Sequence, residues 1–388
     1  MYNIYCLNNI SKVGLNAFSK DYQIIDHLKD AHAIMVRSAS MHEMELPDSV
    51  LAVARAGAGV NNIPLEAYAK KGIVVFNTPG ANANAVKELI IAGMLLASRD
   101  IHAGMNWIKE NKEDPAINKT VEKAKAQFGG TEISGKTIGI IGIGAIGILL
   151  ANACAALGMK IVALERNLQI MERIKQYLPV DTTCVSTKED LFPLCDFISL
   201  NLPFIPETKH IIDYDAMMQM KDGVVLLNFA RDGLVNDEDL EKAIKVNKIK
   251  KYVTDFPNPK TANMEGVLAI PHLGASTEEA EDNCASMAAL QLQDYIENGN
   301  LKNTVNFPDL DAGKCGSFSR ISVLYEDREE VSQLIKKITA CEHKIDKFIH
   351  VEKNGFGCAI LDCTEKIDQV SIDAITNLMG VISVRLIK

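Results

Sequence analysis

Three glycines, at positions 142, 144 and 147, have a spacing that suggests chemistry. They lie in GIIGIGAIG (139–147), between the strand candidate TIGII and the helical pattern ILLANACAAL. Such glycines allow a tight turn, let the backbone approach a pyrophosphate, and pack the helix on the strand. The pyrophosphate would then lie on free N–H groups at the helix N-terminus. Glu165 ends the next strand candidate, KIVALE, where it would bind ribose hydroxyls and repel a 2′-phosphate. The pattern therefore predicts NAD rather than NADP.

Two further polar side chains follow strand candidates in the same part of the chain. Arg231 lies in NFARDG (228–233), and His272 lies in PHLGAST (271–277). Functional groups of open α/β sheets gather at the carboxyl ends of the strands, so this position distinguishes His272 from the other histidines. Histidine titrates near neutral pH and suits a general base or acid.

The elements that would position these residues form two alternations of strands and helices. The first has strand candidates at 3–8, 33–38, 51–57 and 72–77, and the second has six strand candidates between 136 and 274. Between them we expect one long helix over 84–108 and a charged loop over 109–130, and another long helix follows over 276–298. Residues 319–388 show the order β-α-β-β-α-β of a ferredoxin-like domain.

This order predicts an α/β protein with a Rossmann-type NAD domain inserted in a flavodoxin-like substrate domain, followed by the ferredoxin-like α+β domain. The expected boundaries are 1–90 with 278–307 for the substrate domain, 91–277 for the NAD domain, 308–318 for a linker, and 319–388 for the last domain.

Composition excludes some functions. Apolar residues make up 47 % of the chain and charged residues 23 %, which is typical of globular proteins. A net charge of −9 argues against nucleic-acid or anionic-membrane partners, and no apolar run is long enough to span a bilayer. The nine cysteines form no CxxC pair, so we expect no metal site and no disulfide framework. Reduced thiols of this kind predict a cytoplasmic protein.

Several ordered motifs together resemble the D-2-hydroxyacid dehydrogenase family. They are AGAGVNNIPLEA (56–67), NTPGANANAVKELI (77–90), GTEISGKTIGIIGIGAIG (130–147), NLPFIPETKHII (201–212), NFARDG and PHLGAST. The resemblance implies hydride exchange between C2 of a 2-hydroxy acid and the nicotinamide. It makes His272 the base that removes the hydroxyl proton, and Arg231 the group that holds the substrate carboxylate and polarises the C2 oxygen. The last domain is similar to ACT domains, which regulate or assemble such enzymes.

The resemblance also implies two sets of binding residues. The cofactor set is Gly142, Gly144, Ala145, Ile146, Gly147, Glu165, Leu202, Pro203, Thr208, Phe229, Ala230, Arg231, Asp255, His272 and Gly274. The substrate set is Arg37, Ser38, Arg55, Ala58, Gly59, Val60 and Lys87. Within the second set, Arg37 would contact a phosphate, Arg55 and Lys87 would add positive charge, and the backbone N–H groups of 58–60 would bind a carboxylate.

The chain departs from the family pattern at the third catalytic residue. The family has an aspartate and, five residues later, a glutamate that raises the pKa of the histidine. Here the aspartate is Asp255, but the later position holds Lys260. Three alternatives stay open: Glu265 replaces the glutamate, Lys260 takes part, or His272 acts without such a partner. An ammonium beside His272 would lower its pKa. Ala145 also stands where the family often has an arginine.

Within the family, the arginines near the substrate loop resemble those of enzymes that oxidise 3-phospho-D-glycerate to 3-phosphohydroxypyruvate, the first step of serine biosynthesis. The alternatives are a glyoxylate or hydroxypyruvate reductase, a 2-hydroxyglutarate dehydrogenase, and an NAD-sensing protein without catalysis. We expect a homodimer or homotetramer. The loop YEDREEV (325–331) lacks the Pro-Gly of ACT ligand loops. For the last domain we therefore expect a role in assembly rather than serine sensing.

Overall fold

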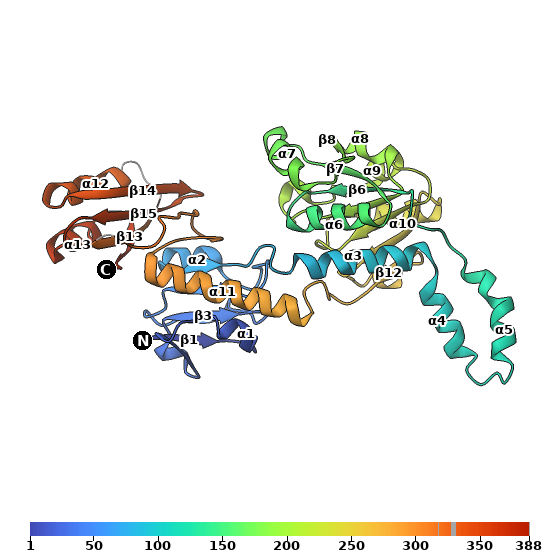
Figure 1. The fold of residues 1–388 in the computed structure, drawn as a ribbon, viewed down its shortest axis with the longest axis horizontal. Helices are drawn as coiled ribbons and strands as arrows, with labels where there is room; N and C mark the ends of the chain where they lie inside the picture. Colours follow the sequence, from blue (N-terminus) through green and yellow to red (C-terminus); the bar gives the residue numbers. More distant parts are fainter. Residues whose placement is uncertain (317, 327–330, 388) are drawn as a thin grey trace. The chain divides into compact units, whose positions relative to one another are not determined.

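The computed structural model describes residues 1–316, 318–326 and 331–387. Most of the loop considered for serine sensing, 327–330, lies outside them. The chain divides into two compact units, Met1–Asn82 with Glu278–Lys388, and Ala83–Thr277. Figure 1 labels many of the elements of both units. Among the described residues, no helix is both long and apolar enough to cross a membrane.

The first unit contains a parallel sheet of five strands in the flavodoxin-like order β2-β1-β3-β4-β5, which confirms the predicted fold class. The strands are β1 (Tyr2–Cys6), β2 (Tyr22–Ile25), β3 (Ala33–Val36), β4 (Ala52–Arg55) and β5 (Val74–Phe76). Strand β2 was not predicted, because YQII is short and lies at the sheet edge, where two of its four side chains are exposed.

Helices cover both faces of this sheet, because successive strand residues point to opposite sides. Ala33 and Met35 of β3 pack with α11 (Glu278–Asn298), whereas Ile34 and Val36 pack in the core that contains Tyr68 of α2 (Leu65–Lys70). Helix α1 (Lys12–Leu15) lies close to α11, since a Cβ on Gly14 would meet Ala285 Cβ at 2.2 Å. A 3₁₀ turn, η1, spans Leu28–Asp30.

The same unit contains the ferredoxin-like domain, an antiparallel sheet in the order β14-β15-β13-β16. Its elements are β13 (Ser319–Glu326), α12 (Val331–Glu342), β14 (Ile345–Lys353), β15 (Phe356–Cys363), α13 (Gln369–Thr376) and β16 (Val381–Leu386). Ile321 and Val323 pack with its own helices, and Leu324 packs on the other face with Phe307 and α11. The predicted β-α-β-β-α-β order is confirmed.

The second unit contains a parallel sheet of seven strands in the Rossmann order β12-β11-β10-β9-β6-β7-β8. All six predicted strands are present, and the seventh, β8, has only three residues, none of them buried. The strands are β6 (Thr137–Ile141), β7 (Lys160–Leu164), β8 (Thr183–Val185), β9 (Phe197–Leu200), β10 (Val224–Asn228), β11 (Ile249–Thr254) and β12 (Val267–Ala269). The strand order reverses between β6 and β9, where ligands of such sheets bind.

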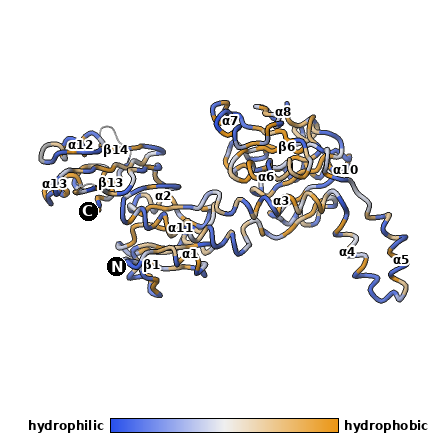
Figure 2. Tube along the Cα trace, viewed as in Figure 1, coloured by the Kyte–Doolittle hydropathy of each residue, from blue (hydrophilic) through white to orange (hydrophobic). Residues whose placement is uncertain are grey.

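The helices that flank this sheet are α3 (Ala83–Ser98), α6 (Ala145–Ala156), α7 (Leu168–Ile174), α8 (Lys188–Leu191), α9 (Tyr214–Gln219) and α10 (Asp237–Lys245). Short 3₁₀ turns are η3 (Lys175–Tyr177), η4 (Phe192–Leu194), η5 (Pro206–Thr208) and η6 (Thr261–Asn263). Figure 2 shows hydrophobic residues concentrated along the central strands and α3 of this unit.

Two sequence predictions about the segment 84–130 are wrong. The single helix is two helices, α3 and α4 (Ile101–Glu110), separated at Arg99 and Asp100. The charged loop contains a further helix, α5 (Ile117–Ala124), followed by the 3₁₀ turn η2 (Lys125–Phe128). The many charged residues of this segment led to the loop prediction, although Ile117, Val121 and Ala124 form a narrow apolar stripe at helical spacing. Figure 1 shows α4 and α5 as an arm extending from the sheet of the second unit.

Candidate active site

The glycine-rich turn after β6 has the geometry of a phosphate cradle. Gly142 adopts φ +95°, and a Cβ there would meet the carbonyl oxygen of Asn201 at 2.6 Å. Gly147 packs closely on the turn, since a Cβ on it would meet Gly142 O at 2.4 Å. A Cβ on Gly144 would instead point into open space, and no side chain caps the N-terminus of α6. The first N–H groups of α6 therefore face an open place that suits a pyrophosphate.

Glu165 lies directly after β7, at the neighbouring strand end. With Gly142, Leu202 and Arg166 it lines a pocket of about 420 Å³ in the second unit. One Glu165 oxygen accepts a hydrogen bond from the N–H of Asn167 at 2.9 Å, which orients the carboxylate. The acidic group, the pocket and the glycine-rich turn together fit the adenosine part of a dinucleotide.

Most remaining cofactor candidates surround these strand ends. Thr208 is buried, and its hydroxyl donates to Pro203 O at 2.7 Å, which fixes the turn after β9. Phe229 is buried and packs close to Gly93 of α3, leaving no room for a Cβ there. Ala145 and Ile146 begin α6, and neither is fully buried.

Arg231 is held by the turn that follows β10. The side-chain amide of the buried Asn228 donates to Arg231 O at 2.9 Å, and its Oδ1 accepts from Ala230 N at 3.2 Å. The guanidinium donates to Ala230 O at 2.6 Å. Burial lowers the pKa of Arg231, and the carboxylate of Asp255 opposes this shift. Since an arginine pKa is ordinarily above 12, the side chain remains a cation at neutral pH.

Arg231 and His272 both contact the ring of Phe256. The guanidinium carbon lies 5.6 Å from the ring centroid, and the imidazole and phenyl centroids are 4.4 Å apart. His272 follows β12, and its side chain is exposed. The structure therefore brings together the two residues that the sequence analysis names as catalytic, on one aromatic support.

Asp255 lies between β11 and Phe256 with only 1 % of its surface exposed. Both carboxylate oxygens are enclosed, and neither accepts a hydrogen bond of good geometry from the described residues. Burial raises its pKa to about 6, although the N–H of Gly274 and the Arg231 cation act in the opposite direction. Buried acceptors without a donor are costly and uncommon, which fits a ligand that donates here.

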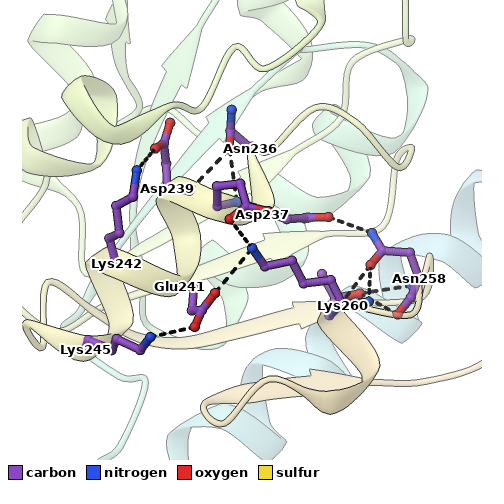
Figure 3. Close-up of polar contacts among 10 residues, drawn as sticks. Asn236, Asp237, Asp239, Glu241, Lys242, Lys245, Asn258 and Lys260 are labelled. Carbon is purple, nitrogen blue, oxygen red and sulfur yellow. Dashed lines mark hydrogen bonds and ion pairs between the residues drawn. The ribbon is translucent and has the colours of Figure 1, made fainter.

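Lys260 and Glu265, the alternatives for the missing glutamate, lie in other surroundings. The Lys260 ammonium binds Glu238 of α10 at 2.5 Å and Glu241 at 3.2 Å. Figure 3 shows Lys260 pointing toward Glu241. Hydrogen bonds to these glutamates raise the pKa of Lys260. Glu265 precedes β12 whereas His272 follows it, and Glu265 lines a pocket of about 670 Å³ with residues from the amino end of β11. Glu265 is thus at the opposite sheet edge from His272, and the Lys260 charge is already neutralised.

The substrate candidates, except Lys87, lie in the first unit. Arg37 follows β3, and Arg55 ends β4 and donates from Nε to Arg37 O at 3.0 Å. Asn8 Oδ1 accepts from the backbone N–H groups of Arg37 and Ser38 at 3.0 and 3.2 Å. The structure thus places the two arginines side by side.

The loop of Ala58, Gly59 and Val60 is held by Asn77, whose amide donates to Ala58 O at 2.6 Å. Within the described part of the chain, the N–H groups of these three loop residues donate no hydrogen bond. Lys87 belongs to α3 of the second unit, where its ammonium binds Asn84 at 2.7 Å and Glu88 at 3.4 Å. No group of three metal-ligating side chains occurs among the described residues.

Sequence reasoning missed Phe256 and Asn228. Phe256 directly follows Asp255, and Asn228 begins the NFARDG motif, so both lay inside stretches already singled out. Neither carries a group that reacts, and their roles depend on tertiary contacts. A buried asparagine that ends a strand and precedes a functional arginine is the signal that could have indicated Asn228.

The fold and the strand-end residues define a two-unit α/β protein that binds NAD. The chain belongs to the D-isomer-specific 2-hydroxyacid dehydrogenase family. The family model of the NAD-binding domain matches residues 91–274. The chain is 33 % identical to a hydroxypyruvate reductase from Thermotoga maritima over 271 residues, 67 % of this chain and 83 % of that protein.

Two further proteins extend the similarity. A D-3-phosphoglycerate dehydrogenase from Methanocaldococcus jannaschii is 30 % identical over 338 residues, 83 % of this chain and 61 % of that protein. A crystal structure of an NAD⁺-bound 3-phosphoglycerate dehydrogenase from Entamoeba histolytica is similar with a TM-score of 0.61 and 28 % identity. That similarity covers 80 % of this chain and 99 % of the other. The chain spans between about half and three fifths of the length of the curated phosphoglycerate dehydrogenases that it matches.

Proposed function

We propose that this protein oxidises 3-phospho-D-glycerate to 3-phosphohydroxypyruvate with NAD, as the first step of serine biosynthesis. The observation that carries the proposal is the joint packing of Arg231 and His272 on Phe256, at the strand ends of the NAD-binding unit. The similarity to proteins named D-3-phosphoglycerate dehydrogenase supports this choice of substrate.

This proposal gives roles to four residues of the second unit: Arg231, His272, Phe256 and Asp255. NAD, when bound, supplies the nicotinamide that accepts the hydride. His272 removes the proton of the C2 hydroxyl, and Arg231 holds the carboxylate and the C2 oxygen through its planar set of donors. Phe256 packs against both side chains and so limits their rotation. The enclosed Asp255 carboxylate, which has no hydrogen-bond partner of good geometry among the described residues, would accept a hydrogen bond from the cofactor.

The substrate phosphate is assigned to Arg37 and Ser38, which are neighbours in the chain, with Arg55 and Lys87 as additional cations. The carboxylate would bind the N–H groups of Ala58, Gly59 and Val60, which have no acceptor among the described residues. The proposal keeps the domain boundaries expected from the sequence: 1–90 with 278–307 for substrate, 91–277 for NAD, 308–318 as linker and 319–388 as an ACT-like domain.

We also propose a homodimer or homotetramer in the cytoplasm. Helix α4 exposes Ile101, Met105 and Ile108 by 42 %, 55 % and 49 %, and their spacing places them on one helix face. A second copy that covers this face would bury it. The free cysteines of the described residues fit a reducing compartment.

Initial rates of NADH formation across 2-hydroxy acids test the proposed activity. The panel is 3-phosphoglycerate, glycerate, glycolate and 2-hydroxyglutarate, each with NAD and with NADP. We expect 3-phosphoglycerate with NAD to give the highest kcat/KM. The similarity to a hydroxypyruvate reductase favours one second candidate, and a preference for glycerate would select it. NAD binding without turnover of any acid would indicate an NAD sensor and refute the proposal.

A further inference from the structure

The proposed phosphate residue already has an anionic partner inside the protein. Arg37 Nη2 lies 2.7 Å from Glu281 Oε1, and the two side chains are 36 % and 39 % exposed. Glu281 is in the first turn of α11, where a carboxylate is favoured by the helix dipole. The pair is thus formed by two elements distant in sequence, β3 with its following residue and α11.

The Arg37 side chain starts from a firmly held backbone. Its N–H donates to Asn8, and its carbonyl oxygen accepts from Arg55. The buried Cys284, one turn beyond Glu281, experiences the charges of Arg37, Arg55 and Glu281 together. Two guanidinium groups and one carboxylate therefore lie in this corner of the first unit.

We propose that Glu281 weakens the binding of the phosphorylated acid by competing with the substrate phosphate for Arg37, an inference that rests on the proposed function. A phosphate dianion is attracted strongly enough to displace a half-exposed carboxylate from the guanidinium. A substrate with an uncharged end cannot displace it and gains nothing from Arg37. Glu281 thus lowers the affinity for the phosphorylated acid and keeps the guanidinium in place while the substrate is absent.

The expected size of the effect is modest because the pair is half-exposed. Replacing Glu281 with glutamine keeps the shape of the side chain and removes its charge. We expect KM for 3-phosphoglycerate to fall by about two- to fivefold, which equals about 0.4–1 kcal/mol and lies in the range of half-exposed ion pairs. The value of kcat should stay within about twofold, since Glu281 does not belong to the reacting groups.

The experiment compares the complete protein with Glu281→Gln, Arg37→Ala and a matched control, Glu279→Gln. Glu279 is exposed on the same helical turn and undergoes the same change of charge. Steady-state KM and kcat are measured with 3-phosphoglycerate and with glycerate, which lacks the phosphate, and circular dichroism verifies the fold. A lower KM for 3-phosphoglycerate alone, in Glu281→Gln alone, is the expected result.

The outcomes separate the inference from the proposed function. An unchanged or higher KM in Glu281→Gln overturns the inference. If KM in Glu281→Gln is unchanged or higher but Arg37→Ala no longer prefers 3-phosphoglycerate over glycerate, the inference fails and the proposed function stands. If Arg37→Ala keeps the wild-type KM for 3-phosphoglycerate, the phosphate assignment fails, and the inference fails with it. An equal fall of KM in Glu279→Gln would assign the effect to overall charge and would also overturn the inference.

Discussion

Replacing Asp255 with asparagine is predicted to stabilise the protein near neutral pH. The carboxyl is 1 % exposed, and burial raises its pKa from 3.8 to about 6. A raised pKa means that the folded state binds the proton more tightly than the unfolded state. The contribution of Asp255 to stability is therefore greatest in acid and is lost as the pH rises through 6. Asparagine has nearly the same shape and carries no charge at any pH.

The magnitude follows from the two pKa values. Because the pKa rises from 3.8 to about 6, linkage gives a stability penalty of about 1 kcal/mol at about pH 4.5 and about 3 kcal/mol at about pH 7.5. We therefore expect the free energy of unfolding of Asp255→Asn, relative to wild type, to rise by about 2 kcal/mol across this range. Other carboxyl groups titrate in both proteins alike, so they cancel in the difference.

Urea unfolding of the cofactor-free protein measures this difference. Circular dichroism and the fluorescence of Trp107, which lies in the same unit, report the transition. Asp181→Asn is the matched control, because Asp181 is an exposed aspartate of that unit. A difference between Asp255→Asn and wild type that does not change with pH, or that falls as the pH rises, would refute the reasoning about burial.

Three other substitutions give independent predictions. Glu165→Ala should raise KM for NAD by about 10- to 100-fold, because hydrogen bonds to a charged acceptor are lost. The variant should also have a smaller ratio of kcat/KM for NAD to kcat/KM for NADP. Initial rates with both cofactors measure this ratio, and an unchanged ratio would contradict the assignment of Glu165 to the ribose. Met105→Glu should dissociate the oligomer by placing a charge in the exposed face of α4, which light scattering detects; an unaltered mass would exclude this face. Arg320 is buried, binds Asp362 through two contacts of 2.6 and 2.7 Å, and also donates to Asn298 O and Gly313 O. Arg320→Met should lower the free energy of unfolding by about 3–5 kcal/mol, because it leaves the Asp362 carboxylate buried without a partner. The double variant Arg320→Met with Asp362→Leu should regain part of that free energy. An equal loss in the single and double variants would contradict this reasoning.

Much of the fold could be predicted from the sequence because its signals are local. Apolar runs such as TIGII and the glycines that follow them indicate strand, turn and helix within a few residues. The sequence did not predict strand β2 (four residues), strand β8 (three residues) or helix α5 (eight residues), because such short segments show little hydrophobic periodicity. The strand-end position of Arg231 and His272 was equally readable, because parallel strands share one carboxyl edge.

Side-chain partners could not be read in the same way. The spacing from Asp255 to Lys260 left open whether this lysine takes part in the reaction, and the structure pairs it with Glu238 and Glu241 of α10. The pairing of Arg37 with Glu281 joins residues 244 positions apart, so no local pattern indicates it. Such contacts depend on how separate elements pack, so the sequence motifs alone do not indicate them.

Single-turnover NADH formation in His272→Gln tests the central claim most directly. The claim is that His272 and Arg231 act on one substrate at the edge of the NAD-binding unit. With 3-phosphoglycerate and NAD at concentrations that saturate the variant, the rate of hydride transfer should fall by about 100- to 10,000-fold, the usual contribution of a general base. A hydride-transfer rate within a few fold of wild type would contradict the account.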